Sequence, residues 1–291
     1  MEINIPTTKP FSFRQSLTFA CRFAPLETAA IIEADRMVAA FAAGGRGWAC
    51  ELRERRSEND ELVVTLPAGA PKHLAARMSD LVGARDDLRP FYALAATDPA
   101  MAPVVANLHG LHQVRFLGLE EIAVYCVMMQ RTPIRIVATY KLRFLERFGL
   151  PVDFEGRTLR AMPSIEALAR LEIDDIADAI NHRPKAERIA GVVRGVAKLG
   201  EPFLTTAPYA EARDALLEIP GIGPFSAVAI LLRGLGRAEE VPSIEMFEDA
   251  GREIYGARWK PKAIAAHYGN HIGTWAFYLK TAASRVVASA A

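Results

Sequence analysis

The stretch LLEIPGIGPFSAVAILLRGLG, Leu216 to Gly236, places a proline and two glycines between two segments that both have helical patterning. The segment before the break has one apolar face with the i, i+3, i+4, i+7 spacing of a helix, made by Ala212, Ala215, Leu216 and Ile219. The segment after it starts at Pro224, whose missing N–H costs nothing in the first turn of a helix. The sequence therefore predicts two helices joined by a tight turn.

The turn, Pro220 to Gly223, has the features of an anion-binding site. Gly221 and Gly223 lack a Cβ, so the backbone there can adopt positive φ and another backbone can approach closely. Amides at the start of the following helix point outward, where the helix dipole also favours negative charge. This geometry would hold a phosphate without a lysine. The alternative is an ordinary interhelical turn that uses glycine only for sterics.

Residues 216–227 match the helix-hairpin-helix signature Leu-x-x-[Leu/Ile]-Pro-Gly-[Ile/Val]-Gly-x-x-[Ser/Thr]-Ala at every specified position. On this basis the chain resembles the helix-hairpin-helix DNA glycosylases, and more closely their alkylation-repair branch, 3-methyladenine DNA glycosylase II. Further segments resemble the family in the same order: PFSFRQSLTFACRFAP (10–25), ATDPAMAPVVANLHGLH (96–112), EEIAVYCVMMQRTP (120–133) and PKAERIAGVV (184–193). The resemblance implies that the hairpin anchors DNA phosphates while a nearby carboxylate acts on a nucleotide flipped out of the duplex.

The family carries its catalytic aspartate shortly after a proline downstream of the hairpin, and Glu245 takes that place here. Two residues, rather than the usual one, separate it from Pro242, and glutamate adds a methylene. A carboxylate there can stabilise an oxocarbenium-like sugar and orient water. The alternatives are a helix-start acid that only complements the dipole, or Asp249 as the catalytic group.

A second position bears on the reaction type. Family members that also cut the DNA backbone carry a lysine two residues after the second hairpin glycine, where it forms a Schiff base. Phe225 stands there, so the resemblance implies a monofunctional enzyme. The resemblance also implies a base pocket in which an aromatic ring stacks on the base. Its expected residues are Phe225, Met246, Ile272, Tyr125 and Trp275, with Ala229, Met246 and Ile272 where aromatics are often found.

The remaining expected DNA contacts lie in the hairpin and in the segment VMMQRTP. The resemblance assigns Gln130 to a base edge or the orphan site and Arg131 to the wedge that fills the gap left by the flipped nucleotide. As alternatives, Gln130 caps a helix and Arg131 contacts only a phosphate. The expected hairpin contacts are Gly221, Ile222, Gly223, Pro224 and Ser226. A monovalent cation could also bind the carbonyls of Leu217, Ile219 and Ile222.

The fold expected is α+β. Residues 1–100 form a small mixed domain with an antiparallel sheet, in which 27–43 is helix-like or irregular, 47–67 is a hairpin turning at RSEND, and 71–83 is a helix on the sheet. Residues 101–291 form an all-α helix-hairpin-helix domain of short helices.

Charge and cysteines limit the function classes. The net charge of +1 does not indicate a polyanion partner, but 254–291 contains no acid, and Ile122 to Arg147 is also basic, with Glu146 as its one acid. These segments are either solvated helix faces or two walls of one groove, and Lys185 and Arg188 are expected to be ordinary helix surface. Three scattered cysteines exclude a local zinc or iron–sulfur motif. No secretory or membrane-spanning segment is recognisable.

The resemblance thus implies a monofunctional DNA glycosylase of base excision repair, acting without a cofactor on damaged, chiefly alkylated, purines in duplex DNA. We expect a cytoplasmic monomer associated with a bacterial nucleoid. The alternative is a DNA-binding or damage-binding protein whose catalysis is weakened or lost because Glu245 replaces the aspartate.

Overall fold

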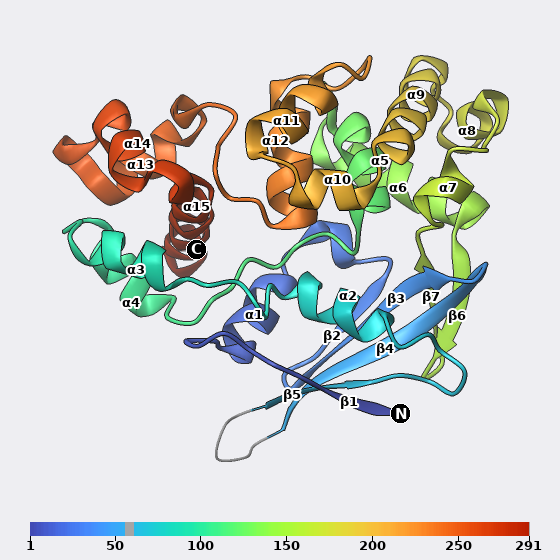
Figure 1. The fold of residues 1–291 in the computed structure, drawn as a ribbon, viewed down its shortest axis with the longest axis horizontal. Coiled ribbons are helices and arrows are strands. Elements are labelled where there is room, and N and C mark those ends of the chain that lie inside the picture. The colour runs from blue at the N-terminus through green and yellow to red at the C-terminus, as the bar shows by residue number, and fades with distance from the viewer. Residues whose placement is uncertain (56–60, 291) are drawn as a thin grey trace.

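The computed structural model describes residues 1–55 and 61–290, of which 285–290 are described by their backbone alone. The RSEND turn expected at 56–60 lies outside the described residues. A sheet forms one side of the molecule and helices arch over it, with the N-terminus in the sheet and the C-terminus in a long helix (Figure 1). The α+β class predicted from the sequence is confirmed.

The sheet has five antiparallel strands in the order β1-β5-β4-β3-β2. Gly44 and Gly45 join β3 to β4 with φ of 59° and 72°, as a two-residue turn matched to strand twist requires. The hairpin expected across 47–67 is β4–β5. The strands are β1 (Glu2–Ile5), β2 (Ala30–Ile32), β3 (Arg36–Ala43), β4 (Arg46–Arg55) and β5 (Glu61–Thr65).

The expectation that 27–43 is helix-like or irregular is wrong, because β2 and β3 form there. Phe41 packs in the core on one face of the sheet, and Val38 packs in a second cluster on the other face. Since both faces of β3 are buried, its sequence lacks the alternation of apolar and polar residues that marks a strand. Its alanines moreover favour helix in isolation, a preference that tertiary packing overrides.

A ribbon of two strands covers the second face of the sheet. It consists of β6 (Leu150–Phe154) and β7 (Arg157–Ala161), and Leu159 shares a buried cluster with Val38. The region 101–291 was expected to be all-α, and this ribbon is its β component. The first face is covered by α1 (Phe13–Ala20) and by α2 (Leu74–Leu81), the helix expected at 71–83.

One helical group joins two distant parts of the chain. It contains α3 (Arg89–Ala96), α4 (Met101–Asn107), α13 (Glu248–Tyr255), α14 (Pro261–Tyr268) and α15 (Ile272–Ala290). Asp98 accepts hydrogen bonds from the hydroxyls of Tyr255 and Tyr268 at 2.6 and 2.9 Å. Helix α3, placed before residue 100 by the sequence, therefore packs with the C-terminal helices rather than with the sheet.

The other helical group surrounds α5 (Leu119–Met129), which is buried on nearly every side. Lys141 lies in its core with Glu121, and the Lys141 ammonium also contacts the carbonyl of Pro25 in the N-terminal region. The other members are α6 (Ile134–Phe148), α7 (Ile165–Leu168), α8 (Ile173–Ile180), α9 (Arg183–Leu199), α10 (Glu201–Thr206), α11 (Tyr209–Leu217) and α12 (Pro224–Ala229), which continues as a π-helical segment (Ile230–Gly234).

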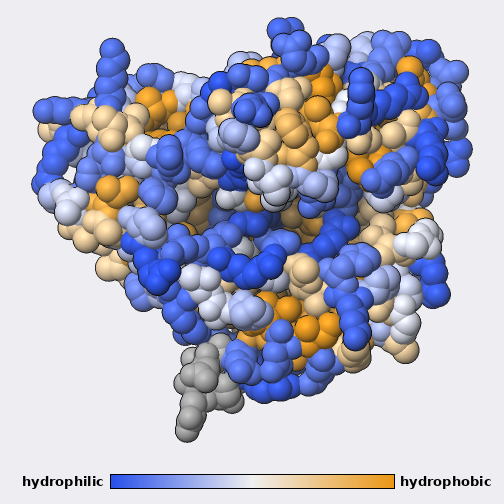
Figure 2. Space-filling view, viewed as in Figure 1, coloured by the Kyte–Doolittle hydropathy of each residue, from blue (hydrophilic) through white to orange (hydrophobic). Residues whose placement is uncertain are grey.

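The surface is mixed in character. On the face shown in Figure 2, hydrophilic residues cover much of the surface and hydrophobic residues lie between them in smaller patches. Within the described residues, no helix has the length and apolar character needed to cross a bilayer.

Candidate functional site

The two glycines of the turn between α11 and α12 have different structural roles. Gly221 has a φ of 98°, and a Cβ built there would lie 2.6 Å from Cγ of Arg188. Gly223 is extended (φ −101°), and a Cβ there would meet no atom within 4 Å. Gly221 is therefore required by the fold, whereas Gly223 leaves the backbone open to approach from outside.

The turn presents free amides. In the described part of the chain, the backbone N–H groups of Gly223, Phe225 and Ser226 donate no backbone hydrogen bond, and Pro224 has no N–H. These amides lie at the start of α12, where the helix dipole adds partial positive charge. The geometry suits an anionic oxygen, as the sequence predicts.

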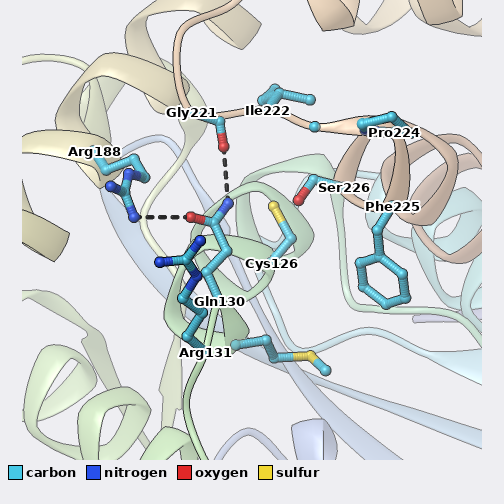
Figure 3. Close-up of a pocket in the computed structure, with 11 residues that line it drawn as sticks. Cys126, Gln130, Arg131, Arg188, Gly221, Ile222, Pro224, Phe225 and Ser226 are labelled. Carbon is cyan, nitrogen blue, oxygen red and sulfur yellow. Dashed lines mark hydrogen bonds between the residues drawn. The ribbon is translucent and has the colours of Figure 1, made fainter.

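A groove with a volume of about 810 Å³ runs beside the turn (Figure 3). Gln130, at the end of α5, spans it: its Nε2 donates to the carbonyl oxygen of Gly221 at 2.8 Å. Its Oε1 accepts from Nη1 of Arg188 at 3.1 Å. Gln130 thus ties the hairpin to α5 and α9. The other lining residues are Cys126, Met129, Arg131 and Ile222 to Ser226.

Arg131 directly follows Gln130 and adopts a φ of 51°. It is exposed and lines the groove. A left-handed conformation is uncommon for a residue other than glycine and is frequent at functional sites. The structure therefore places the expected wedge residue on the open side of the groove.

Lys185 is buried, which corrects the expectation of helix surface, whereas Arg188 is exposed as expected and bonds Gln130 in the groove. Lys185 is only 5% exposed, and its Nζ donates to the carbonyl oxygens of Val127 and Gln130 at 3.2 and 2.7 Å. Burial and the charge of Arg188 lower the pKa of Lys185. These two residues secure the end of α5. Their spacing at i and i+3 in a segment that resembles the family was the available signal.

A second, largely apolar cavity has a volume of about 480 Å³. Phe225 lines both cavities and is 43% exposed. Met246 also lines the apolar cavity and is 50% exposed. Other apolar wall residues are Val228, Ala229, Leu232, Phe247 and Phe277.

The other three residues expected in the base pocket do not line this cavity. Tyr125 is 5% exposed and packs against Phe116, with ring centroids 5.1 Å apart. Trp275 is fully buried, and its Nε1 donates to the Tyr255 hydroxyl at 2.8 Å. Ile272 is 6% exposed in the same cluster as Trp275. Their large side chains are used for packing between helices.

Glu245 lies in the short 3-10 helix Ile244–Phe247 and is exposed. Its neighbours Pro242 and Met246 line the apolar cavity, but Glu245 itself is not part of the wall. The Ser243 hydroxyl donates a hydrogen bond to its carboxylate. That bond, with a smaller contribution from its own backbone amide, lowers the pKa of Glu245, so the side chain is an anion at neutral pH. Asp249, the alternative acid, is exposed in the first turn of α13.

The carbonyl ring expected to bind a cation is partly available. Within the described residues, the carbonyls of Leu217 and Ile222 accept no backbone hydrogen bond, whereas that of Ile219 accepts the Ile222 N–H at 3.0 Å. Such oxygens suit hard cations. The same part of the chain contains no cluster of three His, Cys, Asp or Glu residues that could hold a metal ion.

Sequence comparison finds similarity to bacterial DNA repair proteins over part of the chain. The DNA-3-methyladenine glycosylase of Bacillus subtilis is 31% identical over 152 residues, 52% of this chain and 50% of that protein. A protein described as a probable bifunctional transcriptional activator/DNA repair enzyme in Mycobacterium tuberculosis is 28% identical over 179 residues, 56% of this chain and 35% of that protein. The matches thus span half or less of these relatives' own lengths. No family model matches the chain.

Structure comparison covers nearly the whole chain. The 3-methyladenine DNA glycosylase from Archaeoglobus fulgidus superposes with a TM-score of 0.76 at 18% identity, covering 96% of each chain. At this identity, the likeness concerns the fold alone.

Proposed function

Because the chain belongs to the helix-hairpin-helix DNA glycosylase superfamily, on its 3-methyladenine glycosylase branch, we propose that it is a monofunctional DNA glycosylase of base excision repair. It would flip a damaged purine out of duplex DNA and hydrolyse its N-glycosidic bond. One observation carries the proposal: Phe225, beside the free amides of the hairpin, lines both the groove and the apolar cavity.

The groove is the proposed site for the DNA backbone. The amides of Gly223, Phe225 and Ser226 would bind a phosphate, and Arg188 and Arg131 would add positive charge nearby. A monovalent cation held by the carbonyls of Leu217, Ile219 and Ile222 would strengthen this anchor. Contacts of this kind fix the position of the duplex without reading its sequence.

The apolar cavity is the proposed site for the flipped base. Phe225 offers a ring face for stacking, and Met246 and Phe247 add apolar wall. Flipping is required because the sugar carbon that reacts is inaccessible inside the stacked duplex. Alkylated purines are among the lesions to test, since the relatives' names refer to 3-methyladenine.

Glu245 is the proposed catalytic carboxylate. Its anionic state at neutral pH suits electrostatic stabilisation of an oxocarbenium-like sugar and orientation of the attacking water. Phe225 occupies the place of the family's lysine, so no amine is available there for a Schiff base. The product is therefore an abasic site in an intact strand. One copy of the chain carries all these groups, so we propose a monomer.

A second candidate is a DNA-binding protein without hydrolytic activity. The observation that favours it is the position of Glu245. Its carboxylate accepts a hydrogen bond from the Ser243 hydroxyl on the exposed surface and does not line the cavity. Catalysis then requires the carboxylate to turn toward a bound sugar. If it cannot turn, the groove would still bind DNA.

The test is incubation of the protein with duplexes carrying 7-methylguanine, 3-methyladenine, 1,N6-ethenoadenine, hypoxanthine or 8-oxoguanine. Released base is measured by chromatography, and strand cleavage is measured with and without alkali. The proposal predicts base release from at least one lesion and strand cleavage only after alkali. Cleavage without alkali contradicts the monofunctional assignment. Tight binding without release from any lesion supports the second candidate.

A further inference from the structure

The charge of the apolar cavity indicates which class of damaged base it receives, an inference that rests on the proposed function. Its aromatic wall residues are Phe19, Phe225, Phe247 and Phe277. Free aromatic faces attract cations, so such a wall, taken alone, would favour a positively charged alkylated base. The two cations in the same wall reverse this preference.

Arg233, in the π-helical segment after α12, is the first cation. Its guanidinium carbon lies 5.7 Å from the ring centroid of Phe19 and 5.8 Å from that of Phe277. Its Nη2 donates to the carbonyl oxygen of Val114 at 3.0 Å, and no carboxylate pairs with it among the described residues. Burial lowers the pKa of Arg233 to about 10, so it remains protonated at neutral pH.

Lys280, on α15, is the second cation. Its Nζ lies 5.8 Å from the ring centroid of Phe247. Three of the four aromatic rings in the wall therefore already face a protein cation, and only Phe225 is left for the base. A cationic base would gain little from the occupied rings and would meet like charge in a site of low polarity.

The cavity wall also has hydrogen-bond donors without acceptors. Nε of Arg233 and Nε2 of Gln113 belong to residues that line the cavity, and both atoms are buried with no hydrogen-bond partner in the described part of the chain. Buried donors of this kind are costly to leave unpaired. The described residues that line the cavity include no Asp or Glu. A ligand with acceptor atoms and no positive charge complements the exposed ammonium of Lys280 and the charge of Arg233 in this wall.

The chemistry of bond cleavage agrees. When the bond between C1′ and the base nitrogen breaks, its electron pair stays on the base. A cationic base then leaves as a neutral molecule, whereas a neutral base leaves with a negative charge, which a fixed guanidinium stabilises. For a neutral base, the water that adds to C1′ supplies the proton that the departed base takes up. For a cationic base, the proton from that water passes to solvent, so atoms and charge balance in both cases.

We propose that the cavity selects a neutral damaged base with acceptor oxygen or nitrogen atoms, such as hypoxanthine, and discriminates against positively charged bases such as 7-methylguanine. Arg233 is the main specificity-determining residue, and Lys280 adds to its effect.

The first arm of the test measures the single-turnover rate of base release from otherwise identical duplexes carrying hypoxanthine or 7-methylguanine. The enhancement for each lesion is this rate divided by the rate of release from the same duplex without protein. In the wild type we expect this enhancement to be at least tenfold larger for hypoxanthine. Arg233→Met should reduce the ratio of enhancements at least fivefold. Lys198→Met, an exposed change on α9, should leave the ratio unchanged and serves as the matched control.

Lys280→Met changes an exposed residue and should also reduce the ratio of enhancements. It therefore tests the inference even if Arg233→Met does not fold. An equal or larger enhancement for 7-methylguanine in the wild type would overturn the inference. So would an unchanged ratio in every folded variant of Arg233 or Lys280.

The second arm does not depend on catalysis. It measures, by ligand-observed NMR on the full chain, the binding of two flat probes of similar size, neutral quinolin-2-one and cationic N-methylquinolinium. We expect quinolin-2-one to bind at least tenfold more tightly, with the difference reduced in Arg233→Met or Lys280→Met. Equal binding of the two probes overturns the inference. If no lesion is released but quinolin-2-one still binds more tightly than N-methylquinolinium, the proposed function is contradicted and the charge preference of the cavity is not.

Discussion

Arg131 combines an exposed side chain with a φ of 51°, a conformation that costs an ordinary residue on the order of 1 kcal/mol or more. The backbone bends there because α5 ends at Gln130, whose side chain is fixed to the hairpin. The side chain of Arg131 is thereby directed from the end of a rigid helix into the groove. That position suits a group that enters the duplex.

Substitution of Arg131 distinguishes a wedge from a phosphate contact. If Arg131 fills the gap left by the flipped base, Arg131→Leu should keep most of the base release, because apolar side chains also intercalate. Arg131→Ala should slow release at least tenfold. The measurement is single-turnover release on a saturated duplex.

If Arg131 only contacts a phosphate, the two variants will behave alike. Both will then bind DNA more weakly, and the slope of log affinity against log salt will fall by about 1. That outcome would contradict the wedge assignment.

The pKa of Glu245 predicts a pH dependence. The hydrogen bond from Ser243 favours the anion and lowers the pKa below its usual 4.5. A group with a lowered pKa stays charged until the pH falls below its ordinary value, so release by the wild type should be flat above pH 5. Ser243→Ala should lose a larger share of its neutral-pH rate than the wild type does at pH 4.5. If the rate of release falls equally with decreasing pH in the wild type and in Ser243→Ala, Ser243 does not lower the pKa of this carboxylate.

The positions of candidate site residues were predictable only where the sequence carried a local signal. Phe225 and Met246 lie on a cavity wall, as expected from their places beside the hairpin and Glu245. Tyr125 and Trp275 were expected there too, but they are large apolar side chains on buried helices, and packing requires them. The bond between Gln130 and Gly221 joins residues 91 positions apart, so no local pattern could have revealed it.

At the scale of elements, the two glycines of the hairpin should respond differently to substitution. Gly221→Ala should destabilise the protein by about 1–3 kcal/mol, since the residue has positive φ and its Cβ would collide with Arg188. Gly223→Ala should change stability by no more than about 0.5 kcal/mol, because space is open around it. Urea unfolding measures both.

The same pair tests the phosphate site. A methyl group at Gly223 projects into open space beside the free amides, so Gly223→Ala should weaken binding to all duplex sequences at least fivefold while the protein stays fully folded. Unchanged affinity would show that the amides do not contact DNA.

Helices proved easier to predict than strands. The hairpin and α2 carry turn residues and a single apolar face, which specify them locally. β3 is buried on both sides, so its sequence contains no alternation, and β6 and β7 are too short to stand out between helical segments. Their identity depends on the partner strand, which is a tertiary property.

At the scale of the molecule, a lysine in a buried ion pair connects the helices to the N-terminal region. Lys141 and Glu121 are 3% and 1% exposed, and Lys141 also contacts the carbonyl of Pro25. Lys141→Met should lower the free energy of unfolding by about 3–5 kcal/mol, because it leaves the Glu121 carboxylate buried without a counter-charge. The measurement is urea unfolding followed by far-UV circular dichroism.

The double variant Lys141→Met, Glu121→Gln removes both charges and should recover part of that loss. A double variant less stable than the single one would contradict this explanation. Arg183→Met serves as a control, since Arg183 forms a surface pair with Asp174 in which both side chains are more than half exposed.

Domain organisation follows packing more than sequence position. α3 and α4 lie near residue 100 yet share a core with α13 to α15. The composition change near residue 100 gave no sign that α3, which precedes it, would pack with distant helices. Such pairings depend on contacts between residues far apart in the chain.

The most direct test of the proposed function compares the wild type with Glu245→Gln in single-turnover base release, on the lesion duplex that the wild type processes fastest. Glu245→Gln keeps the shape and removes the charge. We predict release at least a hundredfold slower with unchanged duplex affinity, and partial activity in Glu245→Asp. Release by Glu245→Gln at the wild-type rate would contradict the account, and Asp249→Asn would then identify whether the alternative acid performs the reaction.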